Sequence, residues 1–484
     1  MSRRALAIGS LALLVIGGMA MDVDLDVWHL MALARESLRE GWVPFDDRFA
    51  FTPTVHPSVQ HEWGSGMLLY GIATAGGAPL LLVVRLLLVM ATCALGWRLA
   101  VRRGATEGVL LLLAPTAIVM SWIGWTLIRP QVFTLLLLAI LLWCLDADRR
   151  GDRRWIVPWL AAWILWVNLH GGATVGLAVV GLDGLERTVR GERARHLILV
   201  LGAMLLLMVV NPYGWFYYSY LWGALGMNRR LIGEWQPLIA AQPAALATVT
   251  LALLIALYAL AKLGLRRAVG WPLLVAAAYE AVRHERHVSL FALVWFTQVP
   301  AWVSATRLGE IFERLYARAW GGVVAVLLVL GVLLACREAP WRVRIAGTGP
   351  DAMYAVGPVE RLAELDFHGN LVVPFDTGAY VLWNLTPAVR VSIDSRYEVA
   401  YPPGTLDDHL DFYHAAPRWR DVLRSLSAAD LVLVSRTAPL RPLLEREPGW
   451  TTIYDDDAWA LLARPGLTLP YRDRRGERID GTLP

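Results

Sequence analysis

The sequence has little charge and almost no lysine. Charged residues make up 18% of the 484 residues, hydrophobic residues make up 57%, and Lys262 is the only lysine. Soluble domains have nearer a quarter of charged residues, so this composition excludes an ordinary soluble enzyme. A formal net charge of +4 gives no reason to expect nucleic-acid binding. Apolar runs of membrane length recur up to residue 336, which indicates a polytopic α-helical membrane protein.

Cysteine is scarce, and several catalytic motifs are missing. Cys93, Cys144 and Cys336 each fall in an apolar run, without metal-ligand or disulfide spacing. No phosphate-binding G-x-x-x-x-G-K-[ST] loop and no G-x-S-x-G elbow occurs, which argues against an ATPase or a serine hydrolase. His284-Glu285-Arg286-His287 is one residue short of the zinc-binding H-E-x-x-H helix, so we reject a zinc protease.

The apolar runs predict about eleven transmembrane helices. They lie near residues 5–21, 79–97, 106–124, 131–146, 155–170, 172–187, 196–211, 243–262, 270–282, 288–303 and 319–336. With the N-terminus inside, every inner loop is rich in basic residues, beginning with Arg98, Arg102 and Arg103, as loops beside the anionic inner leaflet are. The pattern predicts a multi-pass protein of the cytoplasmic (inner) membrane, with a cytoplasmic N-terminus and an extracytoplasmic C-terminal segment.

The composition changes after residue 336. We therefore predict a transmembrane domain at 1–336, with a long first outer loop at 22–78, and an extracytoplasmic α/β domain at 337–484. Strands are expected at 370–374, 389–393, 431–435, 451–454 and 459–462, and helices near 27–40, 357–366, 406–426 and 438–446.

Three aspartates follow the first apolar run. If that helix continues outward, Asp22, Asp26 and His29 share one face, whereas Asp24 points elsewhere. A carboxylate held at the membrane surface can act as a general base toward a hydroxyl. The alternative is a solvated acidic cap on the outer side. His61-Glu62-Trp63 adds a second carboxylate and imidazole to the same predicted loop.

Arginines are depleted in the outer segments, so those present there call for a partner. Three such sites stand out: Arg129, the pair Arg283 and Arg286, and the pair Arg229 and Arg230. A guanidinium group binds phosphate bidentately, but these residues could equally pair with the carboxylates of the 22–26 cluster and Glu62.

Two further motifs leave alternatives open. His170, in Asn168-Leu169-His170-Gly171-Gly172, could be a ligand, a base or a hydrogen-bonded turn residue. Asp394-Ser395-Arg396 follows a predicted strand, which is a usual place for binding residues, but Asp394 and Arg396 could also form a local structural pair. A divalent metal ion held by Asp and Glu side chains is possible, and its ligands are unknown.

Taken together, these motifs resemble the bacterial integral-membrane glycosyltransferases of the GT-C superfamily. The resemblance is carried by residues 24–30, 44–51, 61–63, 129–131, 168–172, 211–214, 234–235 and 378–396. It implies a polyprenyl-phosphate-linked sugar donor, an active site on the outer face and an essential acidic residue in the first outer loop. That residue is Asp26 or Asp24, and we favour Asp26.

The resemblance also suggests roles for the other polar residues. Glu62 would position the acceptor or hold a metal ion, and the acceptor would be a glycan, a lipid or a protein. The predicted substrate-binding residues are His29, His61, Arg129, His170, Glu234, Arg283 and Arg286. Transfer would proceed with inversion. The main alternative is a membrane transporter of a polar or lipid-linked substrate, and a membrane-anchored binding protein ranks last.

Overall fold

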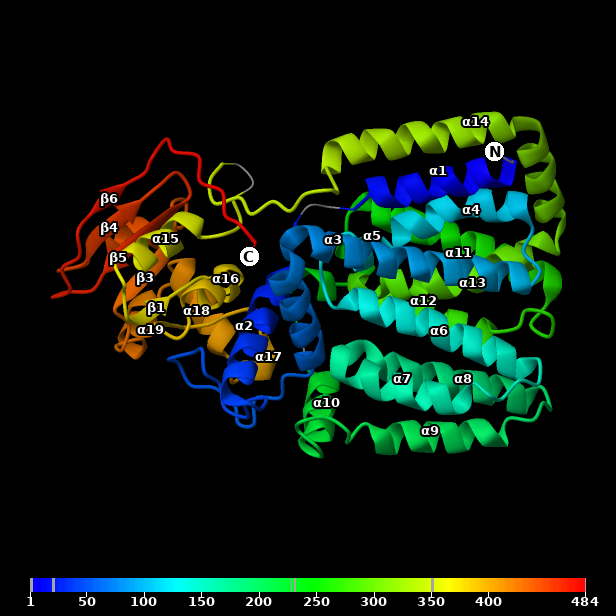
Figure 1. Ribbon diagram of the computed structural model, residues 1–484, viewed down its shortest axis with the longest axis horizontal. Coiled ribbons are helices and arrows are strands. Elements are labelled where there is room, and N and C mark those ends of the chain that lie inside the picture. The colour runs from blue at the N-terminus through cyan, green and yellow to red at the C-terminus, as the bar shows by residue number, and fades with distance from the viewer. Residues whose placement is uncertain (1–2, 20–21, 228, 230–231, 350–351, 484) are drawn as a thin grey trace. The chain divides into compact units, whose positions relative to one another are not determined.

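A computed structural model describes residues 3–19, 22–227, 229, 232–349 and 352–483 (Figure 1). The chain is mostly helical and has one six-stranded sheet. It divides into two compact units. The first unit comprises Met1–Met21, Leu82–Gly214 and Leu225–Arg342, and the second comprises Asp22–Leu81, Trp215–Ala224 and Val343–Pro484.

The first unit is a bundle of apolar helices. Its helices are α1 (Arg3–Gly17), the second part of α3 (Trp63–Arg102), α4 (Glu107–Met120), α5 (Trp122–Trp125), α6 (Gln131–Arg149), α7 (Ile156–Leu169), α8 (Thr174–Val189), α9 (Arg195–Leu207), α11 (Pro243–Leu263), α12 (Trp271–Arg283), α13 (Val288–Ser304) and α14 (Arg307–Glu338). The longer ones run side by side in Figure 1. Helix α13 is buried along almost its whole length, and α4, α11, α12 and α14 pack against it.

Each of the eleven predicted spans coincides with a helix of this unit. Among the described residues, four helices are long and apolar enough to cross a membrane, namely α3, α6, α11 and α14. Helices α4, α7 and α9 are apolar but shorter. The chain is therefore a membrane protein, whereas the count of eleven spans stays a prediction. The end of the first predicted span, residues 20–21, lies outside the described residues.

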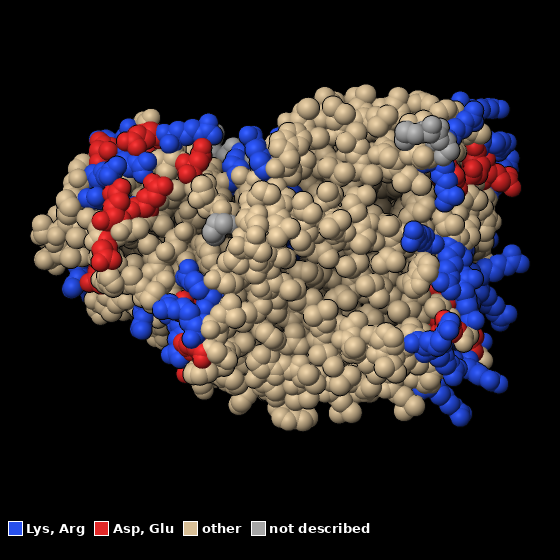
Figure 2. Space-filling view, viewed as in Figure 1, with Lys and Arg blue, Asp and Glu red and all other residues tan. Residues whose placement is uncertain are grey.

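Basic side chains gather at one end of the helical unit, as Figure 2 shows. Beneath them lie buried ion pairs. Arg187 donates to Asp148, and both side chains are almost fully buried. Arg149 and Arg190 bond Glu186, which also accepts from the Gly270 amide at 2.9 Å. These pairs neutralise the acidic side chains at this end, so its exposed charge is mostly basic (Figure 2).

Helix α3 begins inside the segment that we predicted as the first outer loop. Residues 64–76 continue a helical apolar pattern, and the break comes at Gly77, whose φ of 60° and ψ of −157° are not helical. Pro79 follows and lacks an amide hydrogen. The residues before this kink pack with the second unit, whereas those from Leu82 onward pack with the first.

The second unit is built around the mixed sheet β2-β1-β3-β5-β4-β6. Strands β1 (Gly369–Val372), β2 (Val389–Val391) and β3 (Leu431–Ser435) are parallel; β4 (Thr451–Asp455) and β5 (Trp459–Ala463) pair antiparallel, β5 is antiparallel to β3, and β6 (Arg472–Asp473) is parallel to β4. The helices are α2 (Leu25–Glu40), the first part of α3, most of α10 (Phe216–Gly226), α15 (Val356–Glu364), α16 (Phe375–Leu385), α17 (Tyr397–Ala400), α18 (Thr405–Tyr413), α19 (Trp419–Ser425) and α20 (Arg441–Leu444).

The five predicted strands and the helix predicted at 27–40 are confirmed. The single helix predicted at 406–426 is wrong: it is two helices, α18 and α19, because Ala415 adopts a φ of 55° and Pro417 cannot continue a helix. Helix α16 and strand β6 were not predicted. Most residues of helix α16 are buried, including Tyr380, Leu382 and Trp383.

The predicted outer loop completes the core of the C-terminal segment. The Phe51 amide bonds the Val391 carbonyl at 3.0 Å, and the Val391 amide bonds the Phe49 carbonyl at 2.9 Å, so residues 49–51 extend the sheet beyond β2. Helix α2 packs on α16, and Arg35 donates to the Trp383 carbonyl at 2.8 Å. The structure thus groups residues 22–81 with the C-terminal segment, whereas the sequence assigned them to the transmembrane domain.

A buried ion network holds these two chain segments together. Arg396 donates to Asp394 at 2.8 and 2.6 Å and also bonds Asp47 of the first segment. Tyr401 donates to Asp394 at 2.6 Å. The side chains of Asp47, Asp394 and Arg396 are at most 1% exposed. The pair that the sequence left open between binding and structure is therefore structural.

Removing the arginine of this network is expected to destabilise the protein. Arg396→Ala leaves two buried carboxylates without their cation, at a cost of about 3–5 kcal/mol. The matched control is Arg418→Ala, which breaks an exposed pair with Asp408 and Asp411 and is expected to cost about 1 kcal/mol or less. The measurement is the unfolding midpoint of the full chain in detergent. Equal midpoints for the two variants would contradict this account.

Candidate functional site

The cluster of aspartates lies at a break between two helices. Helix α1 ends at Gly17 and α2 begins at Leu25, so the first helix does not continue through the cluster. Asp24 is the N-cap of α2, and its carboxylate accepts a hydrogen bond from the Asp26 amide at 3.0 Å. Asp22 lies before the helix and pairs with Arg344 at 3.4 Å. The expectation that Asp22 shares a helix face with Asp26 and His29 is therefore wrong.

Asp26 and His29 lie together on the first turn of α2. The Asp26 carboxylate is 41% exposed and lies 3.8 Å from Nδ1 of the buried His29 ring. The same nitrogen lies 3.0 Å from Oγ of Ser395, which follows β2. Burial lowers the pKa of His29 to about 4, against the opposing effect of the Asp394 carboxylate. The ring is therefore neutral at physiological pH, beside a carboxylate that solvent can reach.

His61 and Glu62 belong to the same neighbourhood, since the charges of both act on His29. Nε2 of His61 lies 3.4 Å from the Glu62 carboxylate, and its Nδ1 lies 2.8 Å from the Tyr220 hydroxyl. The rings of His61 and Tyr220 stack at 5.0 Å. Helix α10 thus orients the imidazole that touches Glu62. Asp26, His29, His61 and Glu62, with Ser395, are called the acid–histidine group below.

Arg129, Glu234 and Arg286 form a separate group within the first unit. Arg129 binds the Glu234 carboxylate through both terminal nitrogens at 3.0–3.2 Å, and Arg286 approaches it at 3.3 Å. Burial alone would raise the pKa of Glu234, but Arg286 and Arg129 together hold it below its usual value. Arg129 and Arg286 therefore share Glu234 as a partner. These three residues are called the arginine–glutamate group below.

Trp235 extends the arginine–glutamate group with an aromatic surface. The guanidinium groups of Arg229 and Arg286 lie 4.3 and 4.5 Å from the centre of its ring. The Trp235 carbonyl accepts from the His284 ring at 2.8 Å. Arg283 does not join them: it is exposed and contacts Tyr279. Arg230 lies outside the described residues.

His170 has the role of a hydrogen-bonded turn residue. Its Nδ1 accepts from the Gly172 amide at 2.8 Å and lies 2.9 Å from the Thr134 hydroxyl, which in turn accepts from Trp166 at 2.9 Å. Because an amide donates to Nδ1, that nitrogen carries no hydrogen. The charge of His170 also acts on Glu234, so the turn lies beside the arginine–glutamate group.

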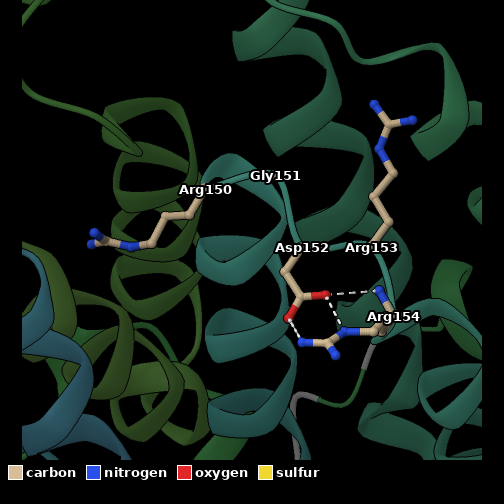
Figure 3. Close-up of a pocket in the computed structure, with 5 residues that line it drawn as sticks. All are labelled: Arg150, Gly151, Asp152, Arg153 and Arg154. Atoms are coloured by element: carbon tan, nitrogen blue, oxygen red, sulfur yellow. Dashed lines mark hydrogen bonds and ion pairs between the residues drawn. The ribbon is translucent and has the colours of Figure 1, made fainter.

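The described residues add no metal-binding cluster to these groups. Within the described ranges, no three His, Cys, Asp or Glu side chains are placed to hold a metal ion. A hollow of about 690 Å³ lies at the loop between α6 and α7. Figure 3 shows that Arg150 and Arg153 point away from each other there, while Arg154 bonds Asp152. Such diverging side chains do not form a catalytic site.

Sequence reasoning missed the side chains that support the candidate residues. Tyr220 and Ser395 contact His61 and His29 from segments that are 159 and 366 residues away in the chain. The only sequence feature that indicated Ser395 was its position directly after a predicted strand. No sequence pattern indicated Tyr220.

Comparisons with known proteins bear on the fold. No protein-family description and no curated protein matches the sequence. The structure is similar to the arabinofuranosyltransferase AftD from mycobacteria, with a TM-score of 0.53 and 17% identity over 96% of this chain and 42% of that one. A second similar structure is the Archaeoglobus fulgidus oligosaccharyltransferase in complex with zinc and sulfate (TM-score 0.47, 14% identity, 90% of this chain and 68% of that one). The chain spans less than half the length of AftD, and its fold is similar to that part of AftD.

Removing the Glu234 carboxylate is expected to destabilise the first unit. Glu234→Ala takes away the shared partner of Arg129 and Arg286, at a cost on the order of 2–3 kcal/mol. Because the Glu234 pKa is lowered in the folded chain, this stabilisation is complete above the ordinary carboxyl range and is lost as pH falls through the lowered value. Unfolding midpoints of wild type and variant should therefore converge in acid.

The control for Glu234 is Glu280→Ala on α12, whose half-exposed carboxylate lies 3.5 Å from His287. We expect it to change the midpoint at neutral pH by less than about 1 kcal/mol. A gap between wild type and Glu234→Ala that stays constant down to acid pH would rule out the ionic origin of the effect.

Proposed function

We propose that the chain is a membrane glycosyltransferase. It would move a sugar from a polyprenyl-phosphate-linked donor to a hydroxyl acceptor on the outer face of the cytoplasmic membrane. The observation that carries the proposal is the Asp26 carboxylate, which solvent reaches and which a neutral, buried His29 accompanies at 3.8 Å. The GT-C-like fold that the chain shares with AftD over 96% of its length supports the same class of reaction.

Asp26 is the proposed general base. It would take the proton of the acceptor hydroxyl while the acceptor oxygen bonds to the anomeric carbon of the sugar. The bond from that carbon to the lipid phosphate oxygen breaks, and the phosphate leaves with the electron pair. A single displacement of this kind inverts the anomeric configuration. Asp24 is the weaker candidate, because its carboxylate already caps α2. Glu62, oriented by His61, would hold the acceptor.

The arginine–glutamate group of the first unit has the charge to bind a phosphate. Two guanidinium groups share one carboxylate there, so the group carries a net positive charge. Arginine binds phosphate oxygens bidentately, and fixed positive charge stabilises the charge that develops on a leaving group. Glu234 keeps both guanidinium groups oriented before the substrate binds. Trp235 and His284 line the same group.

The remaining partners follow from the same proposal. The donor's lipid chain would lie in the membrane, and the acceptor would be a glycan, a lipid or a protein. The basic end of the helical unit supports a cytoplasmic position for that end, because inner loops are rich in arginine. A divalent metal ion has no proposed step, since no ligand set for one is found in the described part of the chain.

Conservative substitutions of the two aspartates test the proposed base. Asp26→Asn is expected to lower turnover by about 10²- to 10⁴-fold, since the amide cannot take a proton. Asp24→Asn is expected to retain activity within a few-fold, because asparagine caps a helix as well as aspartate does. The measurement is sugar transfer by the purified chain in liposomes, with a panel of polyprenyl-phosphate-linked sugars that includes a pentofuranose.

The control for these variants is Asp46→Asn. Asp46 belongs to the same segment, but its carboxylate is exposed and pairs with the exposed His56. Full activity in both Asp26→Asn and Asp24→Asn would refute the mechanism. Passage of an unmodified substrate across the membrane, with no transfer, would instead favour the transporter.

A further inference from the structure

The loop that follows β2 is held rigidly in the core of the second unit. The flanking residues Asp394 and Arg396 bond each other, and the Arg396 amide also donates to the Asp394 carboxylate at 3.0 Å. Gly378 of α16 packs so closely on the Ile393 carbonyl that a β-carbon would not fit. Tyr397 adopts a φ of 36°, which is strained for a residue with a side chain. The position of Ser395 is therefore fixed from both sides.

Ser395 uses this fixed position to contact α2. Its Oγ lies 3.0 Å from Nδ1 of His29, and the same nitrogen lies 3.8 Å from the Asp26 carboxylate. A hydrogen on Nδ1 faces the negative charge of Asp26 favourably, whereas a lone pair there would face it unfavourably. The neutral ring therefore carries its hydrogen on Nδ1 and donates it to Ser395.

We propose that Ser395 is a positioning residue for the base Asp26, which it controls by accepting the Nδ1 hydrogen of His29. This inference rests on the proposed function. While His29 donates its Nδ1 hydrogen to Ser395 Oγ, the imidazole makes no short hydrogen bond to the Asp26 carboxylate, which lies 3.8 Å from Nδ1. The C-terminal segment thereby contributes to the transfer step through a residue that does not touch the substrate.

Removing the Ser395 hydroxyl has a defined consequence. Without its acceptor, the Nδ1 hydrogen of His29 turns to the Asp26 carboxylate. A hydrogen bond to the charged form of a carboxylate favours that form and makes it a weaker base. The other charged or titratable groups that act on His29 are Asp394, Arg396, Glu62 and His61, and none of them is altered. Ser395→Ala should therefore lower turnover by about 10-fold and move the acid limb of its pH profile down by about one unit.

The experiment compares Ser395→Ala with two other serine variants in the full chain. Ser395→Thr keeps the hydroxyl and is expected to restore both the turnover and the acid limb. Ser425→Ala removes an exposed serine hydroxyl of α19, which bonds only its own helix at the Val422 carbonyl, and is expected to match wild type. In a His29→Phe background, Ser395→Ala should have no further effect, because the serine acts through the imidazole.

A second measurement does not require activity. Carbodiimide labelling of the exposed Asp26 carboxyl, followed by mass spectrometry, reports the pH at which that group is protonated. The labelling midpoint should move down by about one unit in Ser395→Ala and stay unchanged in Ser425→Ala. An unchanged midpoint in Ser395→Ala would overturn the inference, even in an active enzyme. A shifted midpoint in a chain that transfers no sugar would support the positioning role and refute the proposed function.

Discussion

The buried contact of Arg396 with Asp47 and Asp394 is the interaction on which the second unit depends. The three side chains are inaccessible to water, so each charge must be satisfied by the others. The contact joins a segment near the start of the chain to one near its end, 349 residues later. Since the same N-terminal segment carries α2, the network also fixes the helix that presents Asp26 and His29. Stability and the proposed chemistry therefore share one anchor.

The arginine–glutamate group and the acid–histidine group differ in the charge state of their buried side chains. In the arginine–glutamate group, Glu234 is kept ionised by two guanidinium groups. In the acid–histidine group, the buried His29 imidazole is kept neutral, and the Asp26 carboxylate beside it is 41% exposed. A charged pair attracts a phosphate, whereas a neutral ring beside a carboxylate leaves the carboxylate basic.

Much of the fold could be predicted from the sequence, because its signals are local. Apolar runs located the helices, and alternating short runs located β1 to β5. The arginines outside the inner loops indicated a polar group, but pattern alone could not show that Glu234 is their partner. The helix ends and kinks also depended on particular residues. Asp24 is the N-cap of α2, so no helix runs from Asp22 to Asp26, and the non-helical Gly77 divides α3. The contacts of Ser395, Tyr220 and Asp47 are long-range, so no local pattern contains them.

The pairing of residues 49–51 with β2 has a consequence for the order in which the chain is assembled. The ribosome completes the first of these segments more than three hundred residues before the second, so α2 leaves it long before its partner exists. Contacts of such separation close late, because the loop between them must first be ordered. The acid–histidine group therefore forms only when synthesis is nearly finished. A nascent or truncated chain can have its apolar helices in the membrane and still lack the site.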